Sequence, residues 1–245
     1  DTPEYRRRIA ERLSRMPPRA NERRLAWCHS PNGLGKGRTW DDSVRFLKEN
    51  GFTDLIANMA WGGSASYDSK VLVRAADFVG KPDPLRECLA ACRKYGIKLH
   101  VWKVCWHTWW GKLPKGTEVM YRAEGRLQSR KDGSSKESWL CPSDPRNRDL
   151  EIAAMCELAD LGVDGVHYDY IRYPGYDCCF CEGCHRRFEK AIGRKIDRWP
   201  VALRGDKALT AKWVDFRAEN ISAVVGAVAA KLRARHPKTE ISAAV

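Results

Sequence analysis

One repeated pattern limits what this chain can fold into: an amphipathic helix, a glycine at the helix end, and then a short apolar strand. Three predicted helices follow capping residues and end at glycines: Thr39 to Gly51, Asp83 to Gly96, and Asp144 to Gly162. A fourth helix is expected over about 211–235. The predicted strands are 25–29, 55–59, 99–106, 163–170 and 241–245. Strands that alternate with helices pair in parallel by default, so the chain is an α/β protein.

The loops of this pattern are unequal in length. Each helix-to-strand turn is expected to span two or three residues, whereas the strand-to-helix loops 60–82, 107–143 and 173–208 are long. Long loops at the carboxyl ends of parallel strands usually carry function. No Gly-x-Gly-x-x-Gly motif follows a strand, which argues against an open nucleotide-binding sheet.

We therefore predict a (β/α)8 TIM barrel that is incomplete, with about five βα units, forming the front part of a longer enzyme. The expected organisation is a basic N-terminal arm over residues 1–22 and a partial catalytic barrel over 23–245. A cysteine-rich insertion is expected at 175–190.

The formal net charge of +13 admits an anionic partner. The arginines are spread over the arm and helix faces and form no recognisable nucleic-acid motif, so we expect no nucleic-acid partner. No apolar run is long enough to span a bilayer, and the start shows no signal peptide. The chain begins at Asp1 rather than at Met, so we expect that it is processed or cut from a longer protein.

The segment 162–174, GVDGVHYDYIRYP, offers the best candidate for catalysis. Alternation along a strand places Gly165, His167 and Asp169 on one face, with Asp169 at the carboxyl end. Parallel α/β folds place their chemistry at that end. We predict that Asp169 is a nucleophile or a general acid/base, and that His167 and Arg172 hold and tune it; the alternative is a structural carboxylate that pairs with Arg172.

Other strand ends bring aromatic and polar side chains to the same rim. Such a set suits a sugar-binding cleft better than an apolar pocket. The alternation left open which face Lys103 and His107 occupy. The predicted substrate-binding residues are Trp27, His29, Asn58, Trp61, Lys103, Trp106, His107 and Tyr173.

Cys179, Cys181 and Cys184 form a C-x-C-x-x-C motif directly after the strand of Asp169. Thiolates at this spacing can hold one tetrahedral zinc ion. Cys141 is the first choice for the fourth ligand, and the alternatives are Cys178, Cys105 and His185. We expect a structural Zn²⁺ rather than disulfides, and no cofactor for catalysis.

The segment 163–174 resembles the signature of the bacterial glycosyl hydrolase-like family 10, and the resemblance covers about residues 24–245. It extends to the motifs WCH at 27–29, NMAWGG at 58–63, HVWK at 100–103 and WLCPS at 139–143. The resemblance implies a TIM-barrel hydrolase of polysaccharides that is extracellular or periplasmic. In related α-glycosidases an aspartate at the end of strand four is the nucleophile, which maps onto Asp169. The cysteine motif is similar to the zinc knuckle of certain barrel β-galactosidases.

Together these features predict hydrolysis of glycosidic bonds in a poly- or oligosaccharide. That chemistry commonly needs two carboxyl groups. Asp68 and Glu118 lie in long loops, and Glu240 begins its strand, so we expect the second acid on strands beyond Val245. A non-catalytic carbohydrate-binding barrel is the main alternative. A zinc-stabilised nucleic-acid binder and a zinc hydrolase with an open metal site are the others.

Overall fold

The computed structural model describes residues 2–4, 7–8, 11–12, 22–108 and 113–244. Most of the predicted basic arm therefore lies outside the described residues. Five parallel strands stand side by side in chain order. They are β1 (Leu25–Cys28), β2 (Asp54–Ala60), β5 (Lys98–Val104), β8 (Gly165–Asp169) and β9 (Glu240–Ala243). This sheet is the one that the sequence pattern predicts.

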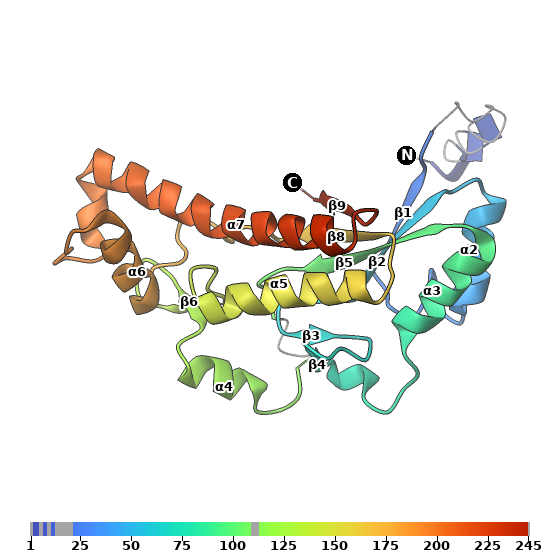
Figure 1. Ribbon diagram of the computed structural model, residues 1–245, viewed down its shortest axis with the longest axis horizontal. Coiled ribbons are helices and arrows are strands. Elements are labelled where there is room, and N and C mark those ends of the chain that lie inside the picture. The colour runs from blue at the N-terminus through green and yellow to red at the C-terminus, as the bar shows by residue number, and fades with distance from the viewer. Residues whose placement is uncertain (1, 5–6, 9–10, 13–21, 109–112, 245) are drawn as a thin grey trace.

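Helices connect these strands, as expected, and cover one face of the sheet (Figure 1). They are α2 (Trp40–Glu49), α3 (Pro84–Tyr95), α5 (Pro145–Asp160) and α7 (Lys207–Arg235). The starts follow the predicted caps, because the side chains of Thr39, Asp83 and Asp144 each accept a backbone N–H of the first turn. Gly96, with φ of 66°, ends α3 in the left-handed region.

The three long loops contain short elements that the sequence pattern did not predict. Residues 60–82 contribute β3 (Ser64–Ala65), β4 (Val73–Arg74) and the 3-10 helix η1 (Ala76–Phe78). Residues 107–143 contribute α4 (Thr117–Ala123) and the antiparallel pair β6 (Leu127–Ser129) and β7 (Ser135–Leu140). Residues 173–208 contribute α6 (Glu182–Ile192) and η3 (Val201–Arg204).

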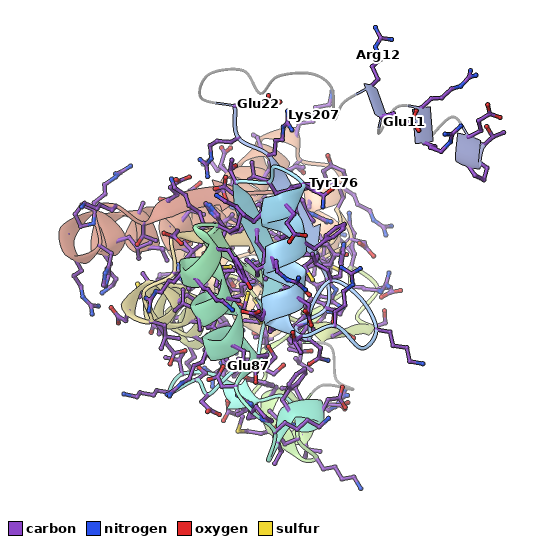
Figure 2. All side chains as sticks on the ribbon, turned by 90° about the vertical axis from the view of Figure 1, so that its right-hand side faces the viewer. Glu11, Arg12, Glu22, Glu87, Tyr176 and Lys207 are labelled. Carbon is purple, nitrogen blue, oxygen red and sulfur yellow. The ribbon has the colours of Figure 1, made fainter. Side chains whose placement is uncertain are left out.

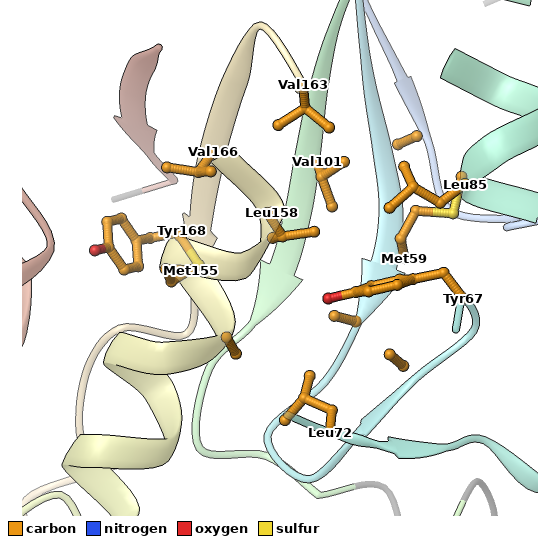
Figure 3. Packing of buried hydrophobic residues seen from close by; sticks show 14 of the residues in the cluster. Met59, Tyr67, Leu72, Leu85, Val101, Met155, Leu158, Val163, Val166 and Tyr168 are labelled. Carbon is orange, nitrogen blue, oxygen red and sulfur yellow. The ribbon is translucent and has the colours of Figure 1, made fainter. Parts of the chain in front are cut away.

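The main core lies between the sheet and the helices. Val101 of β5 and Val166 and Tyr168 of β8 are buried there with Met155 and Leu158 of α5 (Figure 3). At the amino end of the sheet, α2 and α3 pack side by side (Figure 2). This layer explains the apolar helix faces that the sequence shows, because burial of such faces drives the packing.

The opposite face of the sheet carries a different set of side chains. Gly165, His167 and Asp169 share it, as alternation predicts, with His100 and Trp102 of the neighbouring strand β5. A side chain at position 165 would overlap the ring of His100, so the close packing of these strands requires glycine there. In a (β/α)8 barrel the helices pack outside, so this face corresponds to the barrel interior, and we call it the inner face.

A second, smaller core lies beyond the carboxyl ends of the strands. Its buried residues are Cys141, Tyr173, Cys178, Cys179, Phe180, Cys181, Cys184, Phe188, Ile196, Leu203, Leu209 and Trp213. We call residues 173–216 together with Cys141 the cysteine lobe. Helix α6 begins in this lobe, where the Sγ of Cys181 accepts the backbone N–H of Cys184. Among the described residues, none of the helices is both long and apolar enough to cross a bilayer.

Candidate active site and cysteine cluster

Asp169 ends β8 at the rim formed by the carboxyl ends of the strands. Its Oδ2 accepts a hydrogen bond from Nε1 of Trp102 at 3.0 Å, and its Oδ1 accepts the backbone N–H of Tyr170 at 2.8 Å. The side chain remains partly exposed. Two donors therefore fix the orientation of a carboxylate that solvent can still reach.

Arg172 does not hold this carboxylate. Its side chain is exposed, and its guanidinium lies 5.0 Å from the ring centroid of Tyr170. Within the described part of the chain no ion pair joins Arg172 to Asp169. The structural alternative considered from sequence, an Asp169–Arg172 pair, is therefore absent, and Arg172 is available for another contact.

His167 lies on the inner face, two residues before Asp169. Its Nδ1 is 2.8 Å from the Oγ of Ser242 on β9, and its ring meets the edge of Trp27 at 4.7 Å between centroids. Burial lowers the pKa of His167, and the nearby carboxylate of Asp169 opposes that shift only in part. His167 is therefore neutral at pH 7 and supports the site as a neutral ring rather than as a cation.

Aromatic rings form a continuous strip on the inner face. Trp102 makes edge contacts with Trp27 at 4.9 Å and with His29 at 4.6 Å. Trp27 is 44% exposed, and His29 is also exposed. Both line a cavity of about 560 Å³ formed with the loop 30–38. The structure thus brings two of the predicted substrate-binding residues to an open aromatic surface that leads to Asp169.

Asn58 and Trp61 lie beneath this surface. Trp61 is buried in a small cluster with Ile56, Trp102 and Val104. The Nδ2 of Asn58 is 3.5 Å from the backbone oxygen of Trp102. Both residues therefore support Trp102 rather than face a ligand.

The structure does not bring Lys103 or Trp106 to the rim. Lys103 shares the helix-facing side of β5 with Val101, where it is completely buried and paired with Glu151 of α5. The same carboxylate accepts the backbone N–H of Trp106 at 3.0 Å, and the Trp106 ring is completely buried in the main core. A turn with φ of 62° at Trp106 directs its ring inward.

Tyr170 and Trp139 are functional candidates that the sequence analysis did not assign to the site. Their rings stack at 5.4 Å with an interplanar angle of 10°, and His107 meets both rings edge-on. Tyr170 is 37% exposed and has φ of 53°, an uncommon conformation for a bulky residue. Its place directly after Asp169 was the only signal available, since strand alternation ends there.

Trp102 was named only within a motif and not as a site residue. The signal was its position: His167 pairs with it in register across β5 and β8, so both belong to one face. Tyr173, predicted to bind substrate, is mostly buried in the cysteine lobe, with the Arg217 guanidinium 4.3 Å from its ring centroid. Its hydroxyl is buried, and no group in the described part of the chain forms a hydrogen bond with it.

The four predicted cysteine ligands come together and are buried. The Sγ atoms of Cys141, Cys179, Cys181 and Cys184 all lie within 4.8 Å of one another. Cys141 is 3.3 Å from Cys184 and 3.8 Å from Cys181. A tetrahedral zinc site with Zn–S bonds of about 2.3 Å requires sulfur atoms about 3.8 Å apart. Four thiolates at these separations can hold a metal ion.

Of the alternative ligands, Cys178 is buried in the cysteine lobe but is not one of the four grouped thiols, and the other two lie elsewhere. Cys105 is buried in the main core, and His185 contacts the backbone oxygen of Ile196 and stacks on Trp199. No disulfide joins any of the described cysteines. Because all four positions of the cluster are thiols and all are buried, the site is closed, which is typical of structural rather than catalytic metal sites.

Polar groups surround the cluster. The Oγ of Ser143 is 3.2 Å from the sulfur of Cys141 and 3.0 Å from that of Cys184, and it accepts the Nε–H of Arg187 at 3.0 Å. Hydrogen bonds from the three other thiols hold the pKa of Cys141 well below its usual value. A half-buried cation and shared thiol protons favour negative charge at this position.

The fold is that of a partial (β/α)8 barrel, of which the described residues form five parallel strands, and solved structures of glycoside hydrolase domains are similar to it. One solved structure similar to it is the PgaB (BpsB) glycoside hydrolase domain from Bordetella bronchiseptica, with a TM-score of 0.66 and 12% identity; the match covers 90% of this chain and 64% of that chain. Another is the catalytic domain of beta-amylase from Paenibacillus polymyxa, with a TM-score of 0.62, 13% identity, and 89% and 65% coverage.

A hypothetical protein from Ruminiclostridium thermocellum matches with a TM-score of 0.53 and 15% identity, over 90% of this chain and 96% of that chain. In contrast, the present chain spans less than two thirds of the PgaB and beta-amylase chains. At these identities the likeness concerns the fold alone. No protein-family model and no curated protein matches the sequence, so the resemblance to glycosyl hydrolase-like family 10 stays a prediction.

Proposed function

We propose that this protein hydrolyses glycosidic bonds in a poly- or oligosaccharide, with Asp169 as nucleophile or general acid/base. The observation that carries the proposal is the environment of Asp169: a solvent-accessible carboxylate at the strand rim, fixed by Trp102 and Tyr170 and continuous with an exposed aromatic strip. Aromatic faces suit sugar rings, and an oriented carboxylate suits attack on, or protonation at, the scissile bond. The resemblance to glycosyl hydrolase-like family 10 and the glycoside hydrolase folds of the neighbours support it.

Glycoside hydrolysis commonly needs a second carboxyl group about 5–10 Å from the first. The loop acids considered from sequence are engaged elsewhere, Asp68 with Arg74 and Glu118 with Arg122. Glu240 pairs with Arg23 and Lys98 at the amino ends of the strands, which is the opposite end of the sheet. The second candidate function is a barrel that binds carbohydrate without cleaving it, which would need no second acid.

We also propose that the cysteine cluster holds a structural zinc ion, with Cys141, Cys179, Cys181 and Cys184 as ligands. Zinc would supply no step of the reaction; it would fix the loop of Cys141 against the segment after β8. Following the resemblance, we propose an extracellular or periplasmic location, for which cell fractionation is the direct measurement.

The decisive experiment compares wild type, Asp169→Asn and the control Asp197→Asn, an exposed aspartate of the cysteine lobe. Release of reducing ends is measured on a panel of neutral and acidic polysaccharides. An amide cannot serve as nucleophile or base, so Asp169→Asn should lower kcat/KM at least about 10³-fold while the control keeps it. The amide NH₂ of this variant must face one of two hydrogen-bond donors, Nε1–H of Trp102 or the backbone N–H of Tyr170. One hydrogen bond is therefore lost, and we expect a small decrease in the free energy of unfolding.

Near-normal turnover by Asp169→Asn would remove this residue from the mechanism. A wild-type protein that binds a saccharide of the panel but cleaves none would establish the carbohydrate-binding barrel instead. Binding is measured separately by calorimetry, so that the two outcomes are distinguished.

A further inference from the structure

A second cavity lies at the strand rim close to Asp169. It has a volume of about 530 Å³ and is formed between the segment that follows β8 and helix α7. Tyr176, which is 91% exposed, belongs to its edge, and Val214 and Ile221 supply apolar side chains from α7. Figure 2 shows Tyr176 at the surface of the molecule. The cavity therefore offers aromatic and apolar walls near the candidate catalytic carboxylate.

The charged groups of this cavity all have the same sign. Arg172 and Arg217 line it, and none of its lining residues is acidic. In the part of the chain that the structure describes, neither arginine forms an ion pair. The neighbouring acid Asp177 is occupied by Arg130 at 2.7 Å. The site thus presents two guanidinium groups that pair with no carboxylate of the described residues.

Arg217 is held in place by the surrounding structure. Its Nη2 donates to the backbone oxygen of Gly175 at 2.7 Å, and its guanidinium stacks on Tyr173. Its Nε is buried and has no hydrogen-bond partner among the described residues. Because this Nε is buried, a ligand in the cavity meets Arg217 as a fixed positive charge, which attracts an oxyanion.

The cavity on the other side of the rim has the same character. The loop 30–38 brings Lys36 and Arg38 to the cavity that Trp27 and His29 line, again without an acidic lining residue. Lys36 and Arg38 form no ion pair with any described residue. One cationic cavity therefore adjoins the segment that follows Asp169, and the contacts of Trp27 with Trp102 and of Trp102 with Asp169 connect the other to this carboxylate.

We propose that the substrate is an acidic saccharide, whose carboxylate or sulfate groups bind Arg172 and Arg217 on one side and Lys36 and Arg38 on the other. This inference rests on the proposed function, because it names the class of saccharide that reaches Asp169. The aromatic strip takes the sugar faces, and the cations select the charged substituents. The net charge of +13 adds long-range attraction for an anionic chain.

The test measures binding by calorimetry to the Asp169→Asn protein, in which cleavage cannot consume the ligand. Three saccharides are compared: an oligogalacturonate, its methyl ester of the same length, and a sulfated oligosaccharide. The methyl ester keeps the sugar backbone and removes the charge. We expect the oligogalacturonate or the sulfated ligand to bind at least about tenfold more tightly than the ester, a difference of about 1.4 kcal/mol. Which of the two binds better identifies the charged group.

Arg217→Gln and Arg172→Gln should each remove most of this preference and reduce its dependence on salt. Arg233→Gln, in the last turn of the same helix α7, is the matched control and should keep the preference. Because Arg217 also holds Gly175, circular dichroism and thermal melting check that Arg217→Gln folds. Arg172 provides the second variant, since its exposed side chain forms no hydrogen bond within the described residues.

Equal binding of the charged ligands and the ester would overturn the inference. So would a single-stranded oligonucleotide that binds as tightly as the acidic saccharide, since the rim would then be a general polyanion surface. The proposed function fails in a different way: binding of the acidic saccharide without its cleavage by the wild type refutes hydrolysis alone. Cleavage of saccharides without preference for charge refutes the acidic substrate alone.

Discussion

The cysteine lobe and the inner face of the sheet are built in opposite ways. In the lobe, three of the four cluster thiols lie between Cys179 and Cys184, and all four are buried. On the inner face, Trp102 and Asp169 are 67 residues apart and His167 and Ser242 are 75 apart, and parts of the surface remain open to solvent. Local spacing thus specifies a closed site that holds structure, whereas strand register assembles an open site that can meet a ligand.

Removal of a cluster cysteine should separate the two regions most strongly. For Cys184→Ser we expect loss of bound metal and of ordered structure in the cysteine lobe, because structural zinc sites contribute about 10–16 kcal/mol of apparent binding free energy. Metal content by mass spectrometry and hydrogen exchange by segment measure both effects. The sheet should keep its slow exchange.

Cys156→Ser, on α5 outside the cluster, is the matched control and should retain the metal. A Cys184→Ser protein with full metal content would show that the cluster is not the binding site. Rapid exchange throughout the sheet in that variant would show that the two regions are not independent.

The buried Lys103–Glu151 pair should have the converse effect, on the sheet but not on the lobe. Glu151→Ala leaves an uncompensated buried ammonium group and should lower the free energy of unfolding by about 3–5 kcal/mol. The double variant Lys103→Met with Glu151→Leu should recover most of this loss. Urea unfolding measures each value, and an unchanged metal content checks that the lobe is unaffected. A Glu151→Ala protein as stable as the wild type would show that the buried Lys103–Glu151 pair is not needed for the stability of the sheet.

Acid should also destabilise the sheet through Asp54 at the start of β2. Burial opposes ionisation of Asp54, but hydrogen bonds from Arg23, Thr53 and His100 outweigh it and hold the pKa at about 2. A depressed carboxyl pKa stabilises the folded state above the unfolded value of about 4, so about 2 kcal/mol should be lost as the pH falls from 4 to 2. Thermal melting of wild type and Asp54→Asn from pH 7 to pH 2 tests this, since the variant should lack that loss.

Protonation of His167 should change the stability of the protein in a separate, higher pH range. Because burial lowers its pKa, the folded state binds fewer protons than the unfolded state, and stability declines as the pH falls below about 6.5. His167→Gln should flatten the profile between pH 6.5 and 5. A decline that persists in that variant would assign it to another group.

The smallest effect is expected where the two regions meet. Trp139, which lies two residues before the cluster ligand Cys141, stacks on Tyr170. Trp139→Leu should therefore lower the free energy of unfolding by about 1 kcal/mol more than the loss of buried area alone. It should also lower turnover, because Tyr170 donates its backbone N–H to Asp169. Kinetics together with metal analysis test this, and unchanged turnover would mean that the stack does not position the carboxylate.

The sequence predicts the fold and the cluster better than the open site, for physical reasons. Helix caps, terminal glycines and apolar strand runs are local signals, and they place all five parallel strands in order. Cys141 was selected by its place at the end of the long loop that precedes α5, which the three-dimensional grouping supports. Asp164, just before β8, accepts the backbone N–H of Leu99 at 2.9 Å.

The residues that the sequence did not place depend on information that alternation alone does not contain. Lys103 is polar but faces the helices, because a buried carboxylate on α5 receives it. Trp106, just beyond the strand, itself has a left-handed backbone conformation, and its ring points into the core. The strand ends thus fix which side chains reach the rim, while the chain's path after each strand decides which of them remain there.

The cysteine cluster fastens the loop after β5 to the loop after β8. The metal ion that we propose for this cluster would join the two loops, so that neither could move independently of the other. For the proposed saccharide, entry and departure would then take place past Trp27 and His29, whose rings are exposed and face the glycine-rich segment 33–37 across a cavity. Turnover limited by product release would accordingly be set by substitutions on the β1 side of the barrel and not by those near the metal.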